Sequence, residues 1–273
     1  MHTNQHSIGV VINYCTNDYK FIRHNIKRVA KFADEITVST SDHFFDGTNE
    51  NGKILKKSAA ENPEAAFVQL KFDPGKSIQP YWLWRLRRIL KLSLQSGSQY
   101  WICYQRLQGY QALQKKHQYI LFLDADEIVD DKLFIAWLNT KEYKKLKAIK
   151  LACYWYFRKP TYQATTIEDS PLMVKNNQLN RQSFFDYAER QGMYEQIDGQ
   201  KKKMVLGVDK KPMVHHYCWA RTKREMFKKT ASWGHNRDSN WKKRIKEEFS
   251  HPIGKRDFVQ GYELKKVKSF ISK

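Results

Sequence analysis

Three carboxylates follow a short apolar run near the middle of the chain. The run Tyr119-Ile-Leu-Phe-Leu123 leads directly into Asp124, and Asp126 and Glu127 come just after it. Such a run is typical of a strand buried on both faces of a parallel sheet. Ligands of open α/β sheets bind beyond the carboxyl ends of the strands. Because carboxylate oxygens suit Mg²⁺ or Mn²⁺, the run predicts a divalent metal site.

The spacing of Asp124 and Asp126 has two interpretations. Side chains at positions i and i+2 leave an extended chain on the same side, so both aspartates could converge on one ion. Ala125 between them leaves room for a ligand. The alternative is a turn whose aspartate caps a helix that begins near Asp131. The spacing alone does not favour either interpretation.

The elements around this run alternate between strand and helix. β-Branched or apolar runs predict strands at 8–12, 35–39 and 65–70, and apolar residues at helical spacing predict a helix at 19–33. This order favours parallel βαβ units. Other expected elements are a polar loop at 41–52, helices at 80–94, 100–115 and 222–249, and strands at 148–157, 172–175 and, less clearly, 214–219.

The chain is expected to form one compact unit with a basic extension. Nothing repeats and no segment reads as a linker, so we assign residues 1–220 to the main domain and 221–273 to a mainly helical extension packed on it. Trp233, His235 and Trp241 of this extension could stack on a sugar or a base, or pack its helices onto the core.

Positive charge is concentrated near the end of the sequence. The formal net charge is +21, and residues 201–273 contain 21 Lys and Arg against 7 Asp and Glu. Such a field attracts nucleic acid, anionic lipid or phosphorylated substrates. No nucleic-acid motif is present, so no specific nucleic acid is expected. The segment 81–94 resembles an interfacial amphipathic helix, which would allow peripheral contact with an anionic membrane. A helix packed on the sheet with a solvated basic edge is the favoured alternative.

The spacing of the cysteines indicates the cellular compartment in which the protein is expected. Cys15, Cys103, Cys153 and Cys218 are scattered and form no Cys-x-x-Cys pair, so neither a zinc site nor a disulfide framework is expected. The polar first seven residues predict no signal peptide, and no apolar stretch is long enough to span a membrane. These features favour a cytoplasmic protein.

The order of these elements resembles the GT-A glycosyltransferases, in particular the family-2-like inverting enzymes. The resemblance covers about residues 8–175 and departs from the family at Ser41-Asp42 and at the inserted His43-Phe-Phe45, which bears on base recognition. The matching stretches are Val11–Ile22, Glu35–Thr48, Gln105–Ala112 and Phe122–Asp126.

This resemblance implies a Rossmann-like sheet and a nucleotide diphosphate sugar of the UDP or GDP type. It implies that Asp124 and Asp126 hold Mn²⁺ or Mg²⁺ on the diphosphate, and that His216, with His215 behind it, completes the metal shell. The ion would neutralise charge on the departing diphosphate. Further donor contacts are expected from Asn13, Tyr14, Asp42, Arg106, Ala125, Arg221 and Lys223, although Arg221 and Lys223 could also form a solvated basic face.

The acceptor must lose a proton, and the resemblance assigns that role to Asp169, with Glu168 as second choice. A carboxylate suits late proton transfer; the alternative is that both are solvated loop acids before Pro171. The acceptor would be a glycan, a lipid-linked glycan or a protein. The alternative functions are a non-catalytic basic module that binds nucleic acid or anionic membrane, and a metal-dependent nucleotidyltransferase, which would release pyrophosphate.

Overall fold

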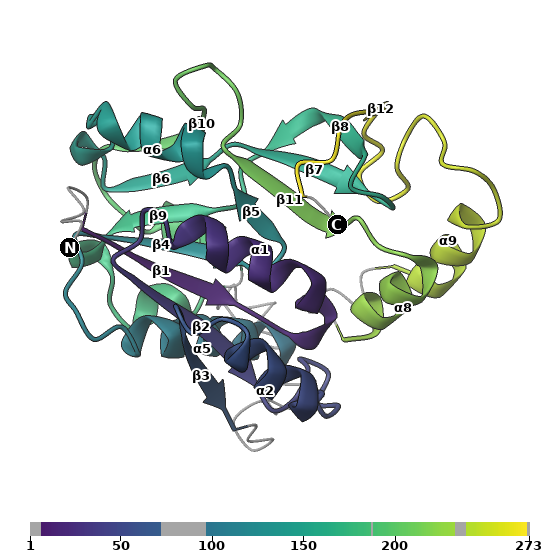
Figure 1. Ribbon diagram of the computed structural model, residues 1–273, viewed down its shortest axis with the longest axis horizontal. Helices are drawn as coiled ribbons and strands as arrows, with labels where there is room; N and C mark the ends of the chain where they lie inside the picture. The colour runs from purple at the N-terminus through teal and green to yellow at the C-terminus, as the bar shows by residue number, and fades with distance from the viewer. Residues whose placement is uncertain (1–6, 72–96, 187, 233–238, 272–273) are drawn as a thin grey trace, which may run out of the picture.

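Two sheets form the framework of the molecule in the computed structural model, which describes residues 7–71, 97–186, 188–232 and 239–271 (Figure 1). Within the larger, seven-stranded sheet, β9 runs antiparallel to both of its neighbours and the other pairs are parallel. The predicted α/β fold with a mostly parallel sheet is therefore confirmed. The strand order is β10 (Lys201–Val205), β6 (Ala148–Leu151), β9 (Leu172–Lys175), β4 (Tyr119–Asp124), β1 (Ile8–Asn13), β2 (Glu35–Ser41) and β3 (Ala66–Leu70).

Helices cover both faces of the larger sheet. Val10 and Ile12 of β1 face an apolar core, and Val11 between them faces a second one, as expected for a strand whose side chains alternate. The first core is closed by α1 (Tyr19–Val29), α2 (Gly52–Ala60) and α6 (Asp131–Asn139). The second is closed by α5 (Gly97–Gln111) and α7 (Arg190–Glu195). Short 3₁₀ helices lie at Thr16–Asp18, Glu142–Lys145, Asn176–Gln178 and Gln182–Phe184.

The carboxyl ends of the central strands lie level with one another. Asn13 at the end of β1 is paired with Asp124 of β4 on one side and with Ser39 of β2 on the other. Residues that follow these strands therefore gather at one edge of the sheet. The segment after β2 was predicted to be a polar loop up to residue 52. It ends at Asn51, which caps α2 by accepting a hydrogen bond from the Ile54 amide at 3.2 Å.

The second sheet begins where a predicted long strand is divided. The run 148–157 was expected to be one strand, but it changes sheet at Ala152, so that Ala148–Leu151 lies in the larger sheet and Cys153–Phe157 in the smaller one. In the smaller sheet, β11 (Val214–Trp219) lies between β5 (Glu127–Val129) and β7 (Cys153–Phe157) and pairs His216 with Glu127. The smaller sheet consists of β12 (Leu264–Lys266), β8 (Tyr162–Glu168), β7 (Cys153–Phe157), β11 (Val214–Trp219) and β5 (Glu127–Val129).

The segment after Ala220 packs against the smaller sheet (Figure 1). It contains α8 (Lys223–Ser232) and α9 (Trp241–Glu248), and then β12, which pairs with β8 and was not expected in a mainly helical extension. The ring centre of Trp241 lies 5.4 Å from that of Trp219 in an apolar cluster. For Trp241, the predicted role of packing a helix onto the core is therefore confirmed. Trp233, His235 and the expected helix at 80–94 lie outside the described residues.

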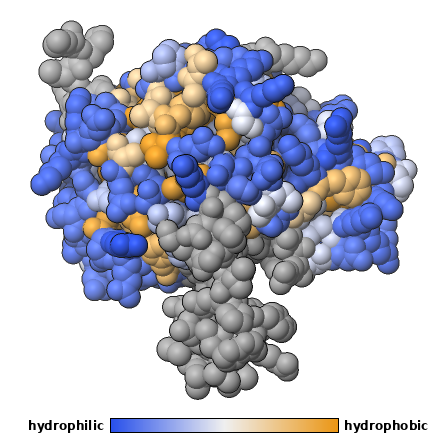
Figure 2. All heavy atoms as spheres, turned by 90° about the horizontal axis from the view of Figure 1, so that it is seen from below, coloured by the Kyte–Doolittle hydropathy of each residue, from blue (hydrophilic) through white to orange (hydrophobic). Residues whose placement is uncertain are grey.

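The surface is largely polar. The face in Figure 2 is mostly hydrophilic, with hydrophobic side chains in one larger area near the top of the view and in smaller areas elsewhere. Among the described residues, Met204 and Val208 are the large hydrophobic side chains that are exposed. Within the same part of the chain, no helix has the length and apolar character needed to cross a bilayer.

Candidate functional site

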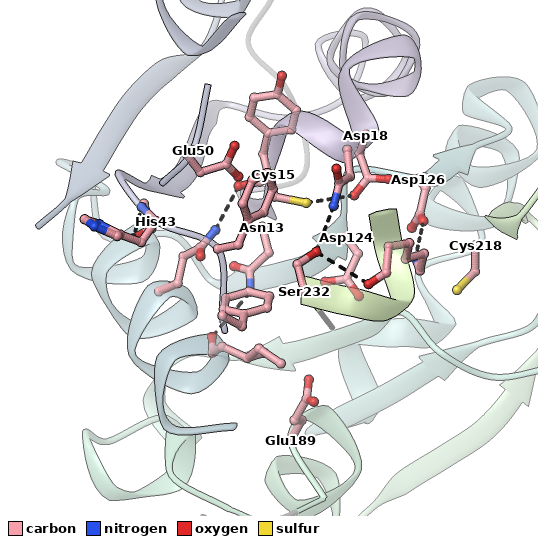
Figure 3. A pocket seen from close by; sticks show the side chains of 18 of the residues that line it. Asn13, Cys15, Asp18, His43, Glu50, Asp124, Asp126, Glu189, Cys218 and Ser232 are labelled. Carbon is pink, nitrogen blue, oxygen red and sulfur yellow. Dashed lines mark hydrogen bonds and ion pairs between the residues drawn. The ribbon is translucent and has the colours of Figure 1, made fainter. Parts of the chain in front are cut away.

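A cavity of about 300 Å³ lies at the edge where β1, β2 and β4 end (Figure 3). Its floor comes from these strand ends and from α5, and its other walls come from β11, α8 and the loop after β2. Acidic, basic, thiol and aromatic side chains all face it. Its lining includes Asn13, Tyr14, Cys15, Asp18, His43, Phe44, Phe45, Gln105, Asp124, Asp126, Ser170, Glu189, His216, Cys218, Lys229 and Ser232.

Asp126 is a buried carboxylate of this cavity that two basic side chains contact. Its side chain is 3% exposed, and its Oδ2 accepts hydrogen bonds from Arg221 at 2.9 Å and from Lys229 at 3.2 Å. Its Oδ1 lies 3.6 Å from Nε2 of His216. Burial alone would raise the pKa of Asp126, but the charges of Lys229, His216 and Arg221 hold that pKa well below its usual value. The group is therefore an anion that attracts cations.

Asp124 belongs to a different network. Arg190 donates to Oδ2 of Asp124 at 2.9 Å and makes two hydrogen bonds, of 2.6 and 2.9 Å, to the fully buried Glu127. Arg106, also buried, lies 3.4 Å from Asp124 and 3.5 Å from Glu189. Arg190 is thus a bidentate clamp that neutralises the acids following β4.

The chain turns between these two aspartates. β4 ends at Asp124, and Ala125 and Asp126 form a turn before β5 begins. The side chain of Asn25 donates to the carbonyls of Asp124, Ala125 and Glu127, which fixes the turn. The expectation that Asp124 and Asp126 project in parallel from an extended chain is therefore not met, because the turn directs them to separate cations.

The donor atoms suited to a metal ion gather around Asp126 and not around Asp124. One oxygen of Asp126, one ring nitrogen of His216 and the sulfur of Cys218 lie within 4.8 Å of one another. A second set of possible metal ligands also includes His216, together with Cys153 and Glu168. Oxygen, nitrogen and sulfur at this separation fit a divalent ion, so Asp126 and His216 remain the predicted ligands and Asp124 lies outside both groups.

The other expected donor contacts fall into three groups. Asn13 and Tyr14 line the cavity. Asp42 pairs with His43 at 2.7 Å, and it is His43 that lines the cavity. The remaining residues do not line it: Ala125, Arg106 and Arg221 are buried, and Lys223 is exposed.

The expected catalytic acids lie in a second, more open cavity of about 510 Å³. Glu168 ends β8, and Asp169 follows it and pairs with Lys150 at 2.8 Å. Burial raises the pKa of the Glu168 carboxyl above its usual value. Ser170 and Glu189 line both this cavity and the first one. The two cavities therefore adjoin.

Three functional candidates had no clear signal in the sequence. Lys229 is one of many basic residues near the end of the chain, and only the docking of α8 turns it toward Asp126. Glu189 has a backbone φ of 50° and ψ of −121°, an uncommon conformation for a residue with a side chain, and it precedes the clamp residue Arg190. Both lie within residues 178–203, a polar stretch for which the sequence gives no clear structural prediction.

Comparison with known proteins gives likenesses of structure only. No family model matches the chain, and no curated protein matches it. A 4-diphosphocytidyl-2C-methyl-D-erythritol synthase from Anaerococcus prevotii has a TM-score of 0.45 and 12% identity, over 81% of this chain and 96% of that one. Mannosyltransferase PcManGT from Pyrobaculum calidifontis, solved with GDP-Man and Mn²⁺, has a TM-score of 0.44 and 9% identity, over 84% and 62%. S. aureus TarS, residues 1–349, has a TM-score of 0.39 and 13% identity, over 89% and 70%.

Proposed function

We propose that this chain is a metal-dependent, inverting glycosyltransferase of the GT-A type. The observation that carries the proposal is the pair of adjoining cavities that share Ser170 and Glu189. A reaction between a sugar donor and an acceptor needs two such spaces with a common boundary, because holding both reactants in contact supplies much of the rate enhancement. The more enclosed cavity would take the donor and the open one the acceptor.

The donor cavity has groups for each part of a nucleotide diphosphate sugar. His43, Phe44 and Phe45 offer aromatic faces for a base, which stacks on such surfaces. Lys229 is the ammonium that faces the cavity, and we assign it to the diphosphate. Asp126 and His216 would hold Mn²⁺ or Mg²⁺, which when bound supplies Lewis-acid stabilisation of the departing diphosphate.

The chain's own residues would handle the proton and the charge. An acceptor hydroxyl oxygen forms the new bond to the anomeric carbon, while the bond from that carbon to the diphosphate oxygen breaks. We assign the hydroxyl proton to Glu168, because its raised pKa favours a carboxyl that accepts protons and because it lines the open cavity. Asp169 is the second candidate. This order reverses the expectation from the sequence, which placed Asp169 first, because the Asp169 carboxylate is already held by Lys150. Preorganised cations such as Lys229 then stabilise the leaving diphosphate.

Nucleotide binding and product analysis test this function. Purified full-length chain should be stabilised against heat by UDP or GDP in the presence of Mn²⁺, and less so in EDTA, because a ligand that binds only the folded state raises its stability. A donor sugar with acceptor should yield nucleoside diphosphate. Release of pyrophosphate from a nucleoside triphosphate would instead identify a nucleotidyltransferase. Salt-sensitive binding of nucleic acid or anionic vesicles without any nucleotide effect would identify a basic binding module.

A further inference from the structure

Cys218 occupies a position that the spacing of cysteines in the sequence did not indicate. Its free thiol is half-buried and lines the donor cavity, on the same side as Asp126 (Figure 3). His216 lines the same cavity. The sulfur belongs to the group of three donor atoms that lie within 4.8 Å of one another. A third possible metal ligand, of a softer kind than a carboxylate, is thus present at the site.

The local fold explains why these three side chains meet. His216 and Cys218 are two positions apart on β11, so both leave the strand on the same side. Asp126 comes from the turn before β5, and the neighbouring strand holds that turn through a hydrogen bond of 2.8 Å from the Tyr217 amide to the Asp126 carbonyl. Two adjacent strands therefore fix the positions of all three ligands.

One oxygen of Asp126 and one ring nitrogen of His216 lie close to each other on the side of the cavity. Arg221 and Lys229 both bind Oδ2 of Asp126, whereas Oδ1 faces Nε2 of His216 at 3.6 Å. The Nδ1 atom of His216 is buried without a hydrogen-bond partner among the described residues, and it lies on the other side of the ring, 4.0 Å from Oε2 of Glu168. The ring lies between two carboxylates, so a metal ion that binds Nε2 must displace any proton that this nitrogen carries, since ligation requires a deprotonated ring nitrogen.

We propose that Asp126, His216 and Cys218 form a thiolate-containing metal site that prefers zinc-like ions to Mg²⁺. Three protein ligands with one open position are the pattern of catalytic zinc sites, and thiolate ligands select softer ions, whereas Mg²⁺ takes oxygen. Binding converts the Cys218 thiol to a metal thiolate and releases its proton to solvent. A further ligand would come from the donor cavity, which Asp126, His216 and Cys218 line, and its identification as a diphosphate oxygen rests on the proposed glycosyltransferase function.

The second set of possible ligands, His216 with Cys153 and Glu168, is the weaker candidate for a metal site. Cys153 is fully buried and does not line the cavity, so an ion would have to enter the core to reach it. Cys218 and Asp126 both line the cavity, and an ion can reach them directly. We therefore place the site on the Cys218 side of His216.

Cobalt spectroscopy of the full-length chain tests the thiolate ligand without any activity assay. Co²⁺ should produce the near-ultraviolet sulfur-to-cobalt charge-transfer band in the wild type. The band should disappear in Cys218→Ser and persist in Cys15→Ser, a matched control because Cys15 lines the same cavity outside the donor group. Zinc affinity, measured by calorimetry, should fall more than tenfold in Cys218→Ser alone. Circular dichroism checks that both variants fold.

Three results would overturn the site: cobalt binding without the band, no cobalt binding at all, or a band that survives Cys218→Ser. Alkylation followed by mass spectrometry gives a variant-free measurement, in which Zn²⁺ but not Mg²⁺ should protect Cys218. Failure of the glycosyltransferase proposal is recognisable separately. In that case the cobalt band and zinc protection are present, yet neither UDP nor GDP stabilises the zinc-loaded chain. A chain stabilised by nucleotide but lacking the band would retain the enzyme proposal and refute the thiolate site.

Discussion

Nζ of Lys229 lies 3.2 Å from Oδ2 of Asp126, 103 positions earlier in the chain. The lysine comes from α8 and the aspartate from the turn between β4 and β5. A helix that the sequence assigned to a basic extension packed on the main domain therefore supplies a side chain to the cavity at the edge of the larger sheet. At this position, the positive charge of the segment pairs with a buried carboxylate of the cavity and does not lie on the open surface.

Lys229 is expected to bind the diphosphate. Lys229→Ala should weaken UDP or GDP binding by roughly tenfold to a hundredfold, because hydrogen bonds to charged groups contribute about 1.5–3 kcal/mol. Lys223→Ala, on the exposed first turn of the same helix, is the matched control and should bind nucleotide like the wild type. Calorimetry measures both. If Lys223→Ala weakened nucleotide binding and Lys229→Ala did not, the diphosphate contact would be assigned to Lys223.

Arg190 is expected to contribute chiefly to stability. Its replacement by leucine leaves the fully buried Glu127 without its bidentate partner, and such a loss costs about 3–5 kcal/mol. Urea unfolding of Arg190→Leu should show a matching decrease in the free energy of unfolding. Arg181→Leu, at an exposed position shortly before it, should change this free energy by less than about 0.5 kcal/mol. An unfolding midpoint that is equal in the two variants would contradict the clamp.

The assignment of the proton acceptor predicts a ranking of three variants. Glu168→Gln should lower sugar transfer by roughly 10²–10⁴-fold while nucleotide binding stays unchanged, as expected for a lost general base. Asp169→Asn should have a smaller effect, since Asp169 is held by Lys150. Glu189→Gln lies at the boundary of both cavities and serves as the comparison. Should Asp169→Asn or Glu189→Gln lose more transfer than Glu168→Gln, the base would move to that residue.

Asp131 should make folding stability depend on acid pH. It begins α6 and pairs with Lys31 at 2.7 Å and with Arg28. Burial raises the pKa of Asp131, but hydrogen bonds from Lys31 and Arg28 outweigh burial and hold that pKa below its usual value. A carboxyl with a lowered folded-state pKa stabilises the fold above its unfolded pKa of about 3.9, and this contribution is lost as pH falls through the folded value.

Asp131→Asn should therefore lower the free energy of unfolding by about 1–2 kcal/mol at neutral pH. The difference from the wild type should shrink as the pH falls below about 4. Thermal unfolding at several pH values measures it, with the exposed Asp198→Asn as control. A difference that stays constant down to acid pH would show that the charge of Asp131 is not responsible.

The sequence predicted the central strands because their signal is local. Ile8–Asn13 and Tyr119–Asp124 are buried on both faces, and an uninterrupted apolar run is the direct consequence of that burial. Asp126 was found for the same reason, since it follows such a run. The division of 148–157 left no comparable trace: Leu151 and Cys153 are equally buried, so the residue at which the chain changes sheets does not alter the pattern.

Side chains that reach the cavity from distant elements could not be predicted in this way. Cys218 and Lys229 are functional candidates because of which side of β11 and α8 faces Asp126, and that depends on long-range packing. Lys223 and Lys229 are both basic residues of one helix, and composition does not distinguish them. The turn at Ala125–Asp126 is likewise set by Asn25, which donates to it from α1.

The contact between Lys229 and Asp126 has a consequence for synthesis on the ribosome. Asp126 emerges well before α8, so the charge that will be buried at the sheet edge has neither Arg221 nor Lys229 to neutralise it at that stage. Burial of an unpaired carboxylate is costly. We therefore expect the nascent chain to keep this edge hydrated and open until α8 has left the exit tunnel, so that the cavity closes only after most of the polypeptide has been made.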